Sequence, residues 1–230
     1  MLVEFGLFLA ASYLIGSIPL AYIIARWRYG LDIRKYGSGQ VGASNLYRSV
    51  SKKAGILVGL YDAGKGALLV WIAHLLGMEL YMEVAVGIAV VVGHNWPIFL
   101  RFSAGRGLAT TAGVAFYLFP WGIWAFVAGA VFTLLLGASP LPVLVGLAAI
   151  PLASWLFQQP LELTLGLSAL FLILVVRRVT APKTDRSSLV STRGLLINRF
   201  LFDRDIRDGK AWITFKPPAA DKTNTRRGNE

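Results

Sequence analysis

Six long apolar runs alternate with short polar segments through most of the chain. They cover residues 2–25, 54–76, 84–100, 108–137, 141–157 and 161–176. A helix that crosses a bilayer needs about 20 apolar residues, within a usual range of about 17–25. Only 15% of the residues are charged, whereas a soluble domain has about a quarter. With a mean hydropathy of +0.61, the pattern predicts an all-α, polytopic membrane protein.

The run 108–137 is too long for one crossing and short for two. Charge decides between these readings, because Lys and Arg mark the cytoplasmic ends of membrane helices. Arg106 and the basic chain from Arg177 onward should therefore lie on the same side, which requires two crossings by 108–137 with a turn near 119–121. We predict seven transmembrane helices, with the N-terminus outside and the C-terminus in the cytoplasm.

The chain divides into three parts by composition. Residues 1–178 form the predicted seven-span membrane domain, which would carry the catalytic site, and residues 179–215 form a basic cytoplasmic extension. Residues 216–230 are rich in Pro, Thr and charge, and we expect them to be disordered.

The net charge of +11 comes mainly from the ends of the apolar runs and from the extension. Basic residues at these places meet anionic membrane lipid, so we expect membrane lipids and no nucleic acid as partners. The chain has no cysteine and only two histidines, which argues against a metal site.

Two polar loops share one composition. GSGQVGASNLYR at 37–48 and SAGRG at 103–107 both combine glycines with hydroxyls and cations. Glycines let backbone N–H groups approach an anion closely. For either loop alone, tight turns explain the glycines, and membrane topology explains the cations, as well as a binding site does. Both on one face, beside a charged pair inside an apolar run (Asp62 and Lys65) and His94, indicate a phosphate-binding site.

The intramembrane polar residues allow two readings each. Asp62 and Lys65 are three residues apart, so a helix places them on one face, either as a pair that only holds helices together or as the lining of a polar cavity. His94 is either a hydrogen-bonded structural residue or a general base. The chain contains no HX4D, GxSxG, HExxH or Walker sequence.

Longer motifs are more specific. In order, they are YLIGSIPLAYIIAR, DIRxxGSGQVGASNxxR, DxxKG and GHNWPIFLRFSAGRGLATTAGV. Over about Tyr13–Val114, the chain resembles the bacterial acyl-phosphate:glycerol-3-phosphate acyltransferase family. The resemblance implies a seven-span enzyme of the cell membrane that needs no cofactor and whose active site faces the cytoplasm. It would transfer a fatty acyl group from acyl phosphate to the 1-hydroxyl of sn-glycerol 3-phosphate in phospholipid synthesis.

This reaction gives 1-acyl-sn-glycerol 3-phosphate (lysophosphatidic acid) and phosphate, and it implies an upstream enzyme that forms acyl phosphate. The candidate catalytic residues are Ser38, Arg48 and His94. The motifs, together with the charged pair, give these candidate phosphate-binding residues: Ser38, Gly39, Gln40, Gly42, Asn45, Arg48, Lys65, Gly105, Arg106 and Gly107. Gln40 and Arg106 replace the usual Asn and Lys of the family.

A third family motif matches only loosely. Asn198 and Arg199 would align with it, with Asp205 in place of a Glu. The proton of the substrate hydroxyl would pass to His94 or to a substrate phosphate oxygen, and we expect no acyl-enzyme intermediate. Two other functions are compatible with the same loops: a membrane transporter of small anions or glycerol phosphate, and a lipid-binding protein without catalytic activity.

Overall fold

The structure, a computed structural model, describes residues 2–103, 105–135, 141–181, 187 and 190–213. The described residues are helical and form no strand, which confirms the all-α prediction. The predicted tail 216–230 lies outside them. The helices are α1 (Leu2–Gly16), α2 (Leu20–Tyr29), α3 (Ala43–Ser49), α4 (Lys52–Leu75), α5 (Leu80–Asn95), α6 (Leu108–Leu118), α7 (Ile123–Leu135), α8 (Leu141–Leu156), α9 (Leu161–Val179), α10 (Thr192–Phe202) and α11 (Gly209–Ile213). Short 3₁₀ turns are η1 (Ile33–Lys35), η2 (Ile98–Leu100) and η3 (Pro120–Gly122).

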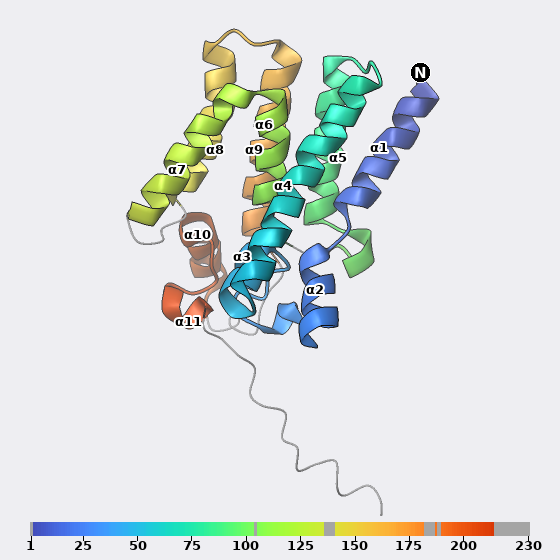
Figure 1. Cartoon of the computed structure of the whole chain (residues 1–230). Coiled ribbons are helices and arrows are strands. Elements are labelled where there is room, and N and C mark those ends of the chain that lie inside the picture. The colour runs from blue at the N-terminus through green and yellow to red at the C-terminus, as the bar shows by residue number, and fades with distance from the viewer. Residues whose placement is uncertain (1, 104, 136–140, 182–186, 188–189, 214–230) are drawn as a thin grey trace, which may run out of the picture.

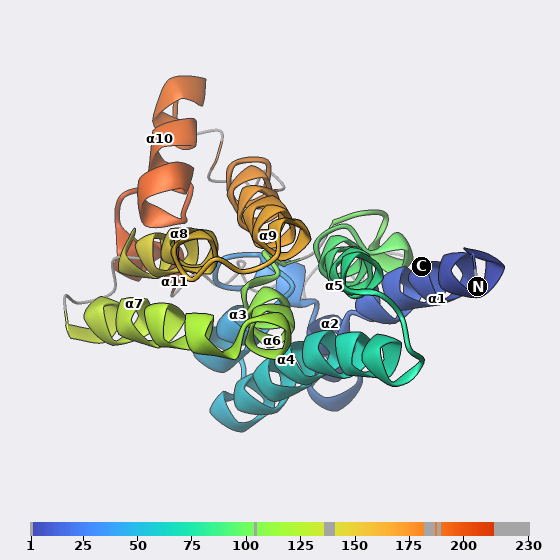
Figure 2. The same ribbon diagram turned by 90° about the horizontal axis from the view of Figure 1, so that it is seen from above.

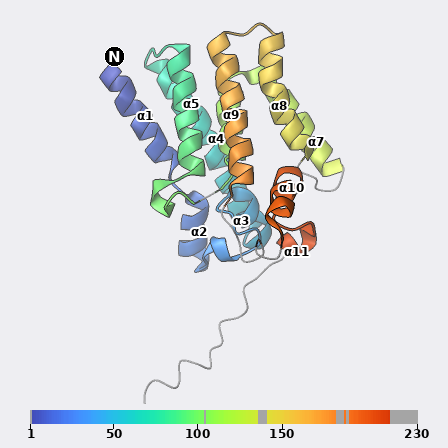
Figure 3. The same ribbon diagram turned by 180° about the vertical axis from the view of Figure 1, so that it is seen from behind.

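Helices α1 and α4–α9 lie alongside one another as a bundle (Figure 1). Helices α2, α3, α10 and α11 gather at the end of the bundle opposite the N-terminus, as the view from behind also shows (Figure 3). Three helical segments are long and apolar enough to cross a membrane, namely Leu2–Tyr29, Lys52–Leu75 and Leu80–Leu100. The protein is therefore a helical membrane protein with a polar cap at one end.

The run 108–137 forms two helices, as predicted. Helix α6 ends at Leu118, and α7 begins at Ile123 after the η3 turn. Pro120 has no N–H to continue the helical hydrogen bonds, so the helix ends before it. The two helices run in opposite directions from this turn (Figure 1).

The first apolar run is broken at Ser17–Pro19, between α1 and α2. Proline disfavours helical backbone at the residue before it. The Leu20 N–H bonds to the Ile18 carbonyl at 3.1 Å, so it does not serve the Gly16 carbonyl as it would in a continuous helix. The break therefore leaves a carbonyl oxygen inside the bundle that needs another donor.

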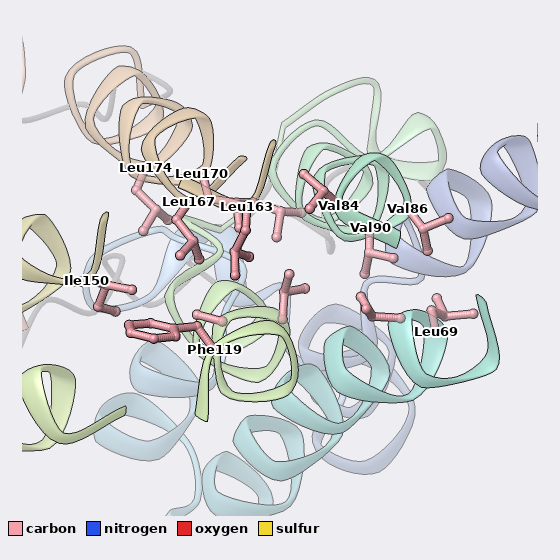
Figure 4. Close-up of a cluster of buried hydrophobic side chains, with 14 of the residues drawn as sticks. Leu69, Val84, Val86, Val90, Phe119, Ile150, Leu163, Leu167, Leu170 and Leu174 are labelled. Carbon is pink, nitrogen blue, oxygen red and sulfur yellow. The ribbon is translucent and has the colours of Figure 1, made fainter. Parts of the chain in front are cut away.

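The core of the bundle lies where α4, α5, α6, α8 and α9 meet (Figure 4). Seen from above, α9 packs between α5 and α8, with α6 and α4 closing the other side (Figure 2). Large apolar side chains such as Leu57, Leu60, Trp155 and Leu165 point outward and are exposed. Such extensive apolar exposure is typical of helices that face lipid.

Small residues let the helices approach closely. A Cβ atom added to Gly66 in α4 would collide with the Thr110 carbonyl of α6. Gly16 in α1 meets the Val90 carbonyl of α5 in the same way. Association of membrane helices depends on such packing, because lipid supplies no hydrophobic drive between them.

We expect Gly66→Ala to destabilise the protein, because overfilling a packed interior costs about 1–3 kcal/mol. Thermal unfolding in detergent measures the effect as a lower melting temperature. Gly64→Ala in the same helix is the matched control, because no atom lies within 4 Å of its added Cβ. Equal melting temperatures for the two variants would show that the α4–α6 contact is not limiting.

Candidate active site

The first polar loop is organised by the side chain of Asn45, which lies in α3 and is buried. Its Nδ2 reaches three carbonyl oxygens, at 3.3, 3.0 and 3.0 Å, which belong to Ile33, Tyr36 and Gln40. Its Oδ1 accepts from the Ser38 N–H at 3.1 Å and from the Ser49 hydroxyl at 3.0 Å. The sequence suggested Asn45 as a phosphate ligand, and the structure shows its polar atoms holding the loop.

Two glycines shape this loop around Ser38. Gly37 and Gly39 have φ angles of 53° and 69°, in the left-handed region that favours glycine. The Ser38 hydroxyl is partly buried and accepts weakly from the Gln40 N–H at 3.4 Å. The Gln40 side chain is buried, and its Oε1 has no hydrogen-bond partner among the described residues. The loop continues through Gly42, the N-cap of α3.

The second polar loop lies against the first. A Cβ atom on Gly105 would stand 2.6 Å from the Val41 carbonyl and 3.2 Å from His94 Nε2. Gly107 has φ 72° and lies against the buried Asn95 amide. The structure thus brings together both polar loops and His94, as expected from their composition.

A buried cluster of charges lies beneath these loops. Lys65 Nζ is 2.9 Å from Asp62 Oδ1, 3.1 Å from the Gly16 carbonyl and 3.1 Å from His94 Nδ1. Lys65 therefore supplies the hydrogen-bond donor that the Gly16 carbonyl needs at the break after α1. An ammonium has three protons, and these three contacts can use all of them. Lys65, a candidate phosphate ligand by sequence, lies buried below the loops and supports His94 instead.

The contacts of Nδ1 with Lys65 and Asp62 bear on the roles of the two His94 nitrogens. Lys65 is paired with Asp62, and an ammonium only donates hydrogen bonds. His94 Nδ1 also lies 3.4 Å from Asp62 Oδ1, so Nδ1 can accept from Lys65, with the proton of a neutral ring on Nε2, or donate to Asp62. Nε2 faces Gly105 and the second loop, and with Nδ1 accepting from Lys65 it would present an N–H donor there.

Arg106 of the second loop has a partner that the sequence did not suggest. Its Nη1 donates to Asp203 Oδ2 at 2.6 Å, and Arg178 Nε lies 3.4 Å from Asp203 Oδ1. Burial raises the pKa of the Asp203 carboxyl, while the charges of Arg106, Arg178 and Arg48 oppose this rise. The exposed Arg48 of α3 thus lies within electrostatic reach of the same carboxyl.

The possible third motif docks the extension onto the bundle. Arg199 is buried and donates to Asp205 Oδ1 at 2.8 Å and to the carbonyls of Val179 and Ala181 at 3.0 and 2.6 Å. Asn198 Nδ2 donates to the Asp205 carbonyl at 3.0 Å. These contacts attach α10 to the end of α9 and bring Asp203 to the second loop.

The end of α9 is itself bound to the second loop. Arg177 Nε donates to the Gly105 carbonyl at 3.0 Å, and its guanidinium lies over the Trp96 ring. A small, mainly apolar cavity adjoins the charged cluster on the side of the α1–α2 break. It is lined by Gly16, Ser17, Ile18, Pro19, Leu20, Ala21, Val41, Asp62, His94 and Pro97.

Comparison with known proteins matches this arrangement to one family. The model of the family described as glycerol-3-phosphate acyltransferase matches residues 6–183. The chain belongs to the glycerol-3-phosphate acyltransferase family. It is similar to glycerol-3-phosphate acyltransferase 4 of Dehalococcoides mccartyi strain CBDB1, with 43% identity covering 91% of this chain and 93% of the relative. Glycerol-3-phosphate acyltransferase 5 of a second Dehalococcoides mccartyi strain is 40% identical and covers 93% of this chain and 94% of its own length.

Two solved structures of a family member share the fold. Both are crystal structures of PlsY (YgiH), described as an integral membrane glycerol 3-phosphate acyltransferase. The glycerol 3-phosphate form has a TM-score of 0.72 and 27% identity, covering 85% of this chain and 94% of that one. The lysophosphatidic acid form has a TM-score of 0.69 at the same identity, covering 76% and 88%.

The family model ends at residue 183, within the first residues of the extension. Asp203 and α10 lie beyond residue 183, whereas both loops, the charged cluster and His94 lie within the matched residues. Sequence reasoning missed Asp203, Arg177 and Arg178. The signal that could have pointed to Asp203 was the DRD sequence in an extension that also carries Asn198 and Arg199.

We expect Asn45→Asp to open the first loop, because three carbonyls would then face a carboxylate. A loss of about 1–2 kcal/mol in loop stability raises the open fraction roughly 5- to 30-fold. Trypsin cleavage after the exposed Lys35 and Arg48 should accelerate accordingly. Ser44→Ala, at an exposed position in α3, is the control. Unchanged cleavage in Asn45→Asp would refute the organising role of this side chain.

Proposed function

We propose that this family member transfers a fatty acyl group from acyl phosphate to the 1-hydroxyl of sn-glycerol 3-phosphate. The products are 1-acyl-sn-glycerol 3-phosphate (lysophosphatidic acid) and phosphate, and an upstream enzyme that forms acyl phosphate supplies the donor. The observation that carries this proposal is the meeting of the two glycine-rich basic loops at His94 Nε2. The relatives named glycerol-3-phosphate acyltransferase support the same reaction class.

We also propose seven membrane crossings, by α1 and α4–α9, with the N-terminus outside and the site at the cytoplasmic face of the cell membrane. The polar cap carries both loops, α3 and α10 (Figure 3). The connections at the opposite end, 76–79, 119–122 and 157–160, contain no Lys or Arg. This asymmetry supports the orientation by the positive-inside rule.

The phosphate of the acyl donor would lie in the first loop, held by Ser38, backbone N–H groups and Arg106. The phosphate of the acceptor needs its own cations, and Arg48 and Lys52 are exposed at this face. Preorganised donors in a site that excludes water stabilise charge more strongly than they would in bulk water. Lys65 contributes indirectly, through the orientation of His94.

The reaction is a single displacement at the acyl carbonyl. The acceptor 1-hydroxyl oxygen forms the new C–O bond, the bond from the acyl carbon to the phosphate oxygen breaks, and phosphate leaves. We assign the hydroxyl proton to a substrate phosphate oxygen, because a His94 ring whose Nδ1 accepts from Lys65 and whose Nε2 carries the proton cannot take it up. His94 then serves as a donor to the developing negative charge, and positioning supplies much of the remaining rate.

Purified protein with acyl phosphate and glycerol 3-phosphate should release inorganic phosphate and form lysophosphatidic acid in equal amounts. Acyl-CoA is the control donor and should give no product. Glycerol phosphate uptake into sealed vesicles without product formation would instead support a transporter. Binding of lysophosphatidic acid without turnover would support a lipid-binding protein.

The donor role of His94 predicts different outcomes for two substitutions. His94→Ala should lower kcat about 10²–10³-fold, the usual cost of removing one such donor. His94→Gln keeps an amide N–H and should retain activity to within about tenfold of the unmodified protein, although it cannot act as a base. If kcat falls equally in both variants, and an ionisation near neutral pH disappears from the profile of rate against pH, His94 acts as a general base instead.

A further inference from the structure

We propose that Asp203 is a positioning residue that aims the guanidinium of Arg106 at the substrate phosphate. The inference rests on the proposed function and extends it to the C-terminal extension. Asp203 would hold one end of the guanidinium, so that the Nε–Nη2 edge of Arg106 faces the site and binds two phosphate oxygens together.

The bonding of Arg106 is one-sided. Nη1 donates to Asp203 Oδ2 at 2.6 Å. Nε and Nη2 are buried and have no hydrogen-bond partner among the described residues. These two nitrogens form one edge of the planar group, with two parallel N–H donors that match two oxygens of a phosphate.

Buried donors without partners are rare and costly, so the place where they lie in the fold indicates what could bind them. The Arg106 backbone lies between Gly105, which packs against Val41 and His94, and Gly107, which packs against Asn95. The unpartnered edge thus belongs to the loop that meets His94. An anion placed there would satisfy both donors within the proposed site.

Asp203 is held in place through the end of α10, so it can act as an anchor, although its Oδ1 has no hydrogen-bond partner among the described residues. Arg178 Nε lies 3.4 Å from Asp203 Oδ1 and donates to the Arg199 carbonyl at 2.8 Å, and Arg178 Nη2 donates to the Leu201 carbonyl at 3.3 Å. These bonds hold the end of α10 beside the second loop. Asp203 bonds to Nη1 and leaves the Nε–Nη2 edge of Arg106 open. Asp203 can therefore orient the guanidinium without competing with the substrate phosphate for that edge.

The chemistry of the two basic side chains explains why an anchor is needed. A lysine ammonium is a compact charge that attracts phosphate from many orientations. A guanidinium binds two oxygens only when its plane is aligned with them. An arginine in the second loop therefore gains from a carboxylate that sets its plane, whereas a lysine would not.

A double-mutant cycle in the full-length protein tests the proposal. Asp203→Asn should raise the KM for one phosphate substrate about tenfold or more and change kcat less than about threefold. Measuring KM for acyl phosphate and for glycerol 3-phosphate separately shows whose phosphate Arg106 holds. When Arg106 is replaced by Lys, Asp203→Asn should change the same KM less than about twofold. In the protein that keeps Arg106, Asp203→Glu should give a KM between those of the unmodified protein and Asp203→Asn.

Inorganic phosphate provides a second readout that does not require turnover. Its stabilisation of the protein against heat should need about tenfold more phosphate in Asp203→Asn. Asp208→Asn removes a charge from the same extension, where the Asp208 carboxyl accepts from the Ala211 N–H at 3.0 Å, and should change nothing. Lack of acyl transfer in the unmodified protein would refute the proposed function, whereas phosphate affinity would still test Asp203.

Two results would overturn the positioning role. A fall in KM in Asp203→Asn would mean that the carboxylate competes with substrate for Arg106. If Asp203→Asn changes KM, kcat and melting temperature by the same amounts whether position 106 is Arg or Lys, Asp203 only docks the extension.

Discussion

A buried ammonium must have close partners, because a charge removed from water is otherwise very costly. Lys65 meets this constraint with Asp62 from its own helix, the Gly16 carbonyl from α1 and His94 from α5. One side chain therefore sets the relative positions of three helices that meet close to their polar ends. The break at Ser17–Pro19 is part of the same solution, since a continuous helix would have used the Gly16 carbonyl itself. The geometry of the site above follows from this arrangement.

The polar residues in and around the site fall into two groups with different roles. Asn45, Lys65, Arg177 and Arg199 bond mainly to protein carbonyls and carboxylates, and they hold loops and helix ends in place. Ser38, His94, Arg48 and Arg106 are the residues to which the proposed function assigns contact with substrate. The proposed site for two phosphate-bearing substrates thus depends on further polar side chains that hold its loops and helix ends.

Sequence reasoning predicted the apolar helices of the bundle, the turn near Pro120 and the meeting of the two loops. These features follow from local composition, which fixes where a helix can continue and where glycines and cations gather. The duties of Asn45 and Lys65 could not be predicted, because motif spacing does not show which donors are already used within the protein. Asp203 was out of reach for another reason: 97 residues separate it from Arg106, and no periodic pattern connects them.

That separation has a consequence for biosynthesis. A nascent chain that ends before residue 203 already contains every helix of the bundle, both loops and the charged cluster. It lacks the carboxylate beside Arg106 and also Asp205, the partner of Arg199. The arginine of the second loop therefore gains its carboxylate partner only after every helix of the bundle has been synthesised.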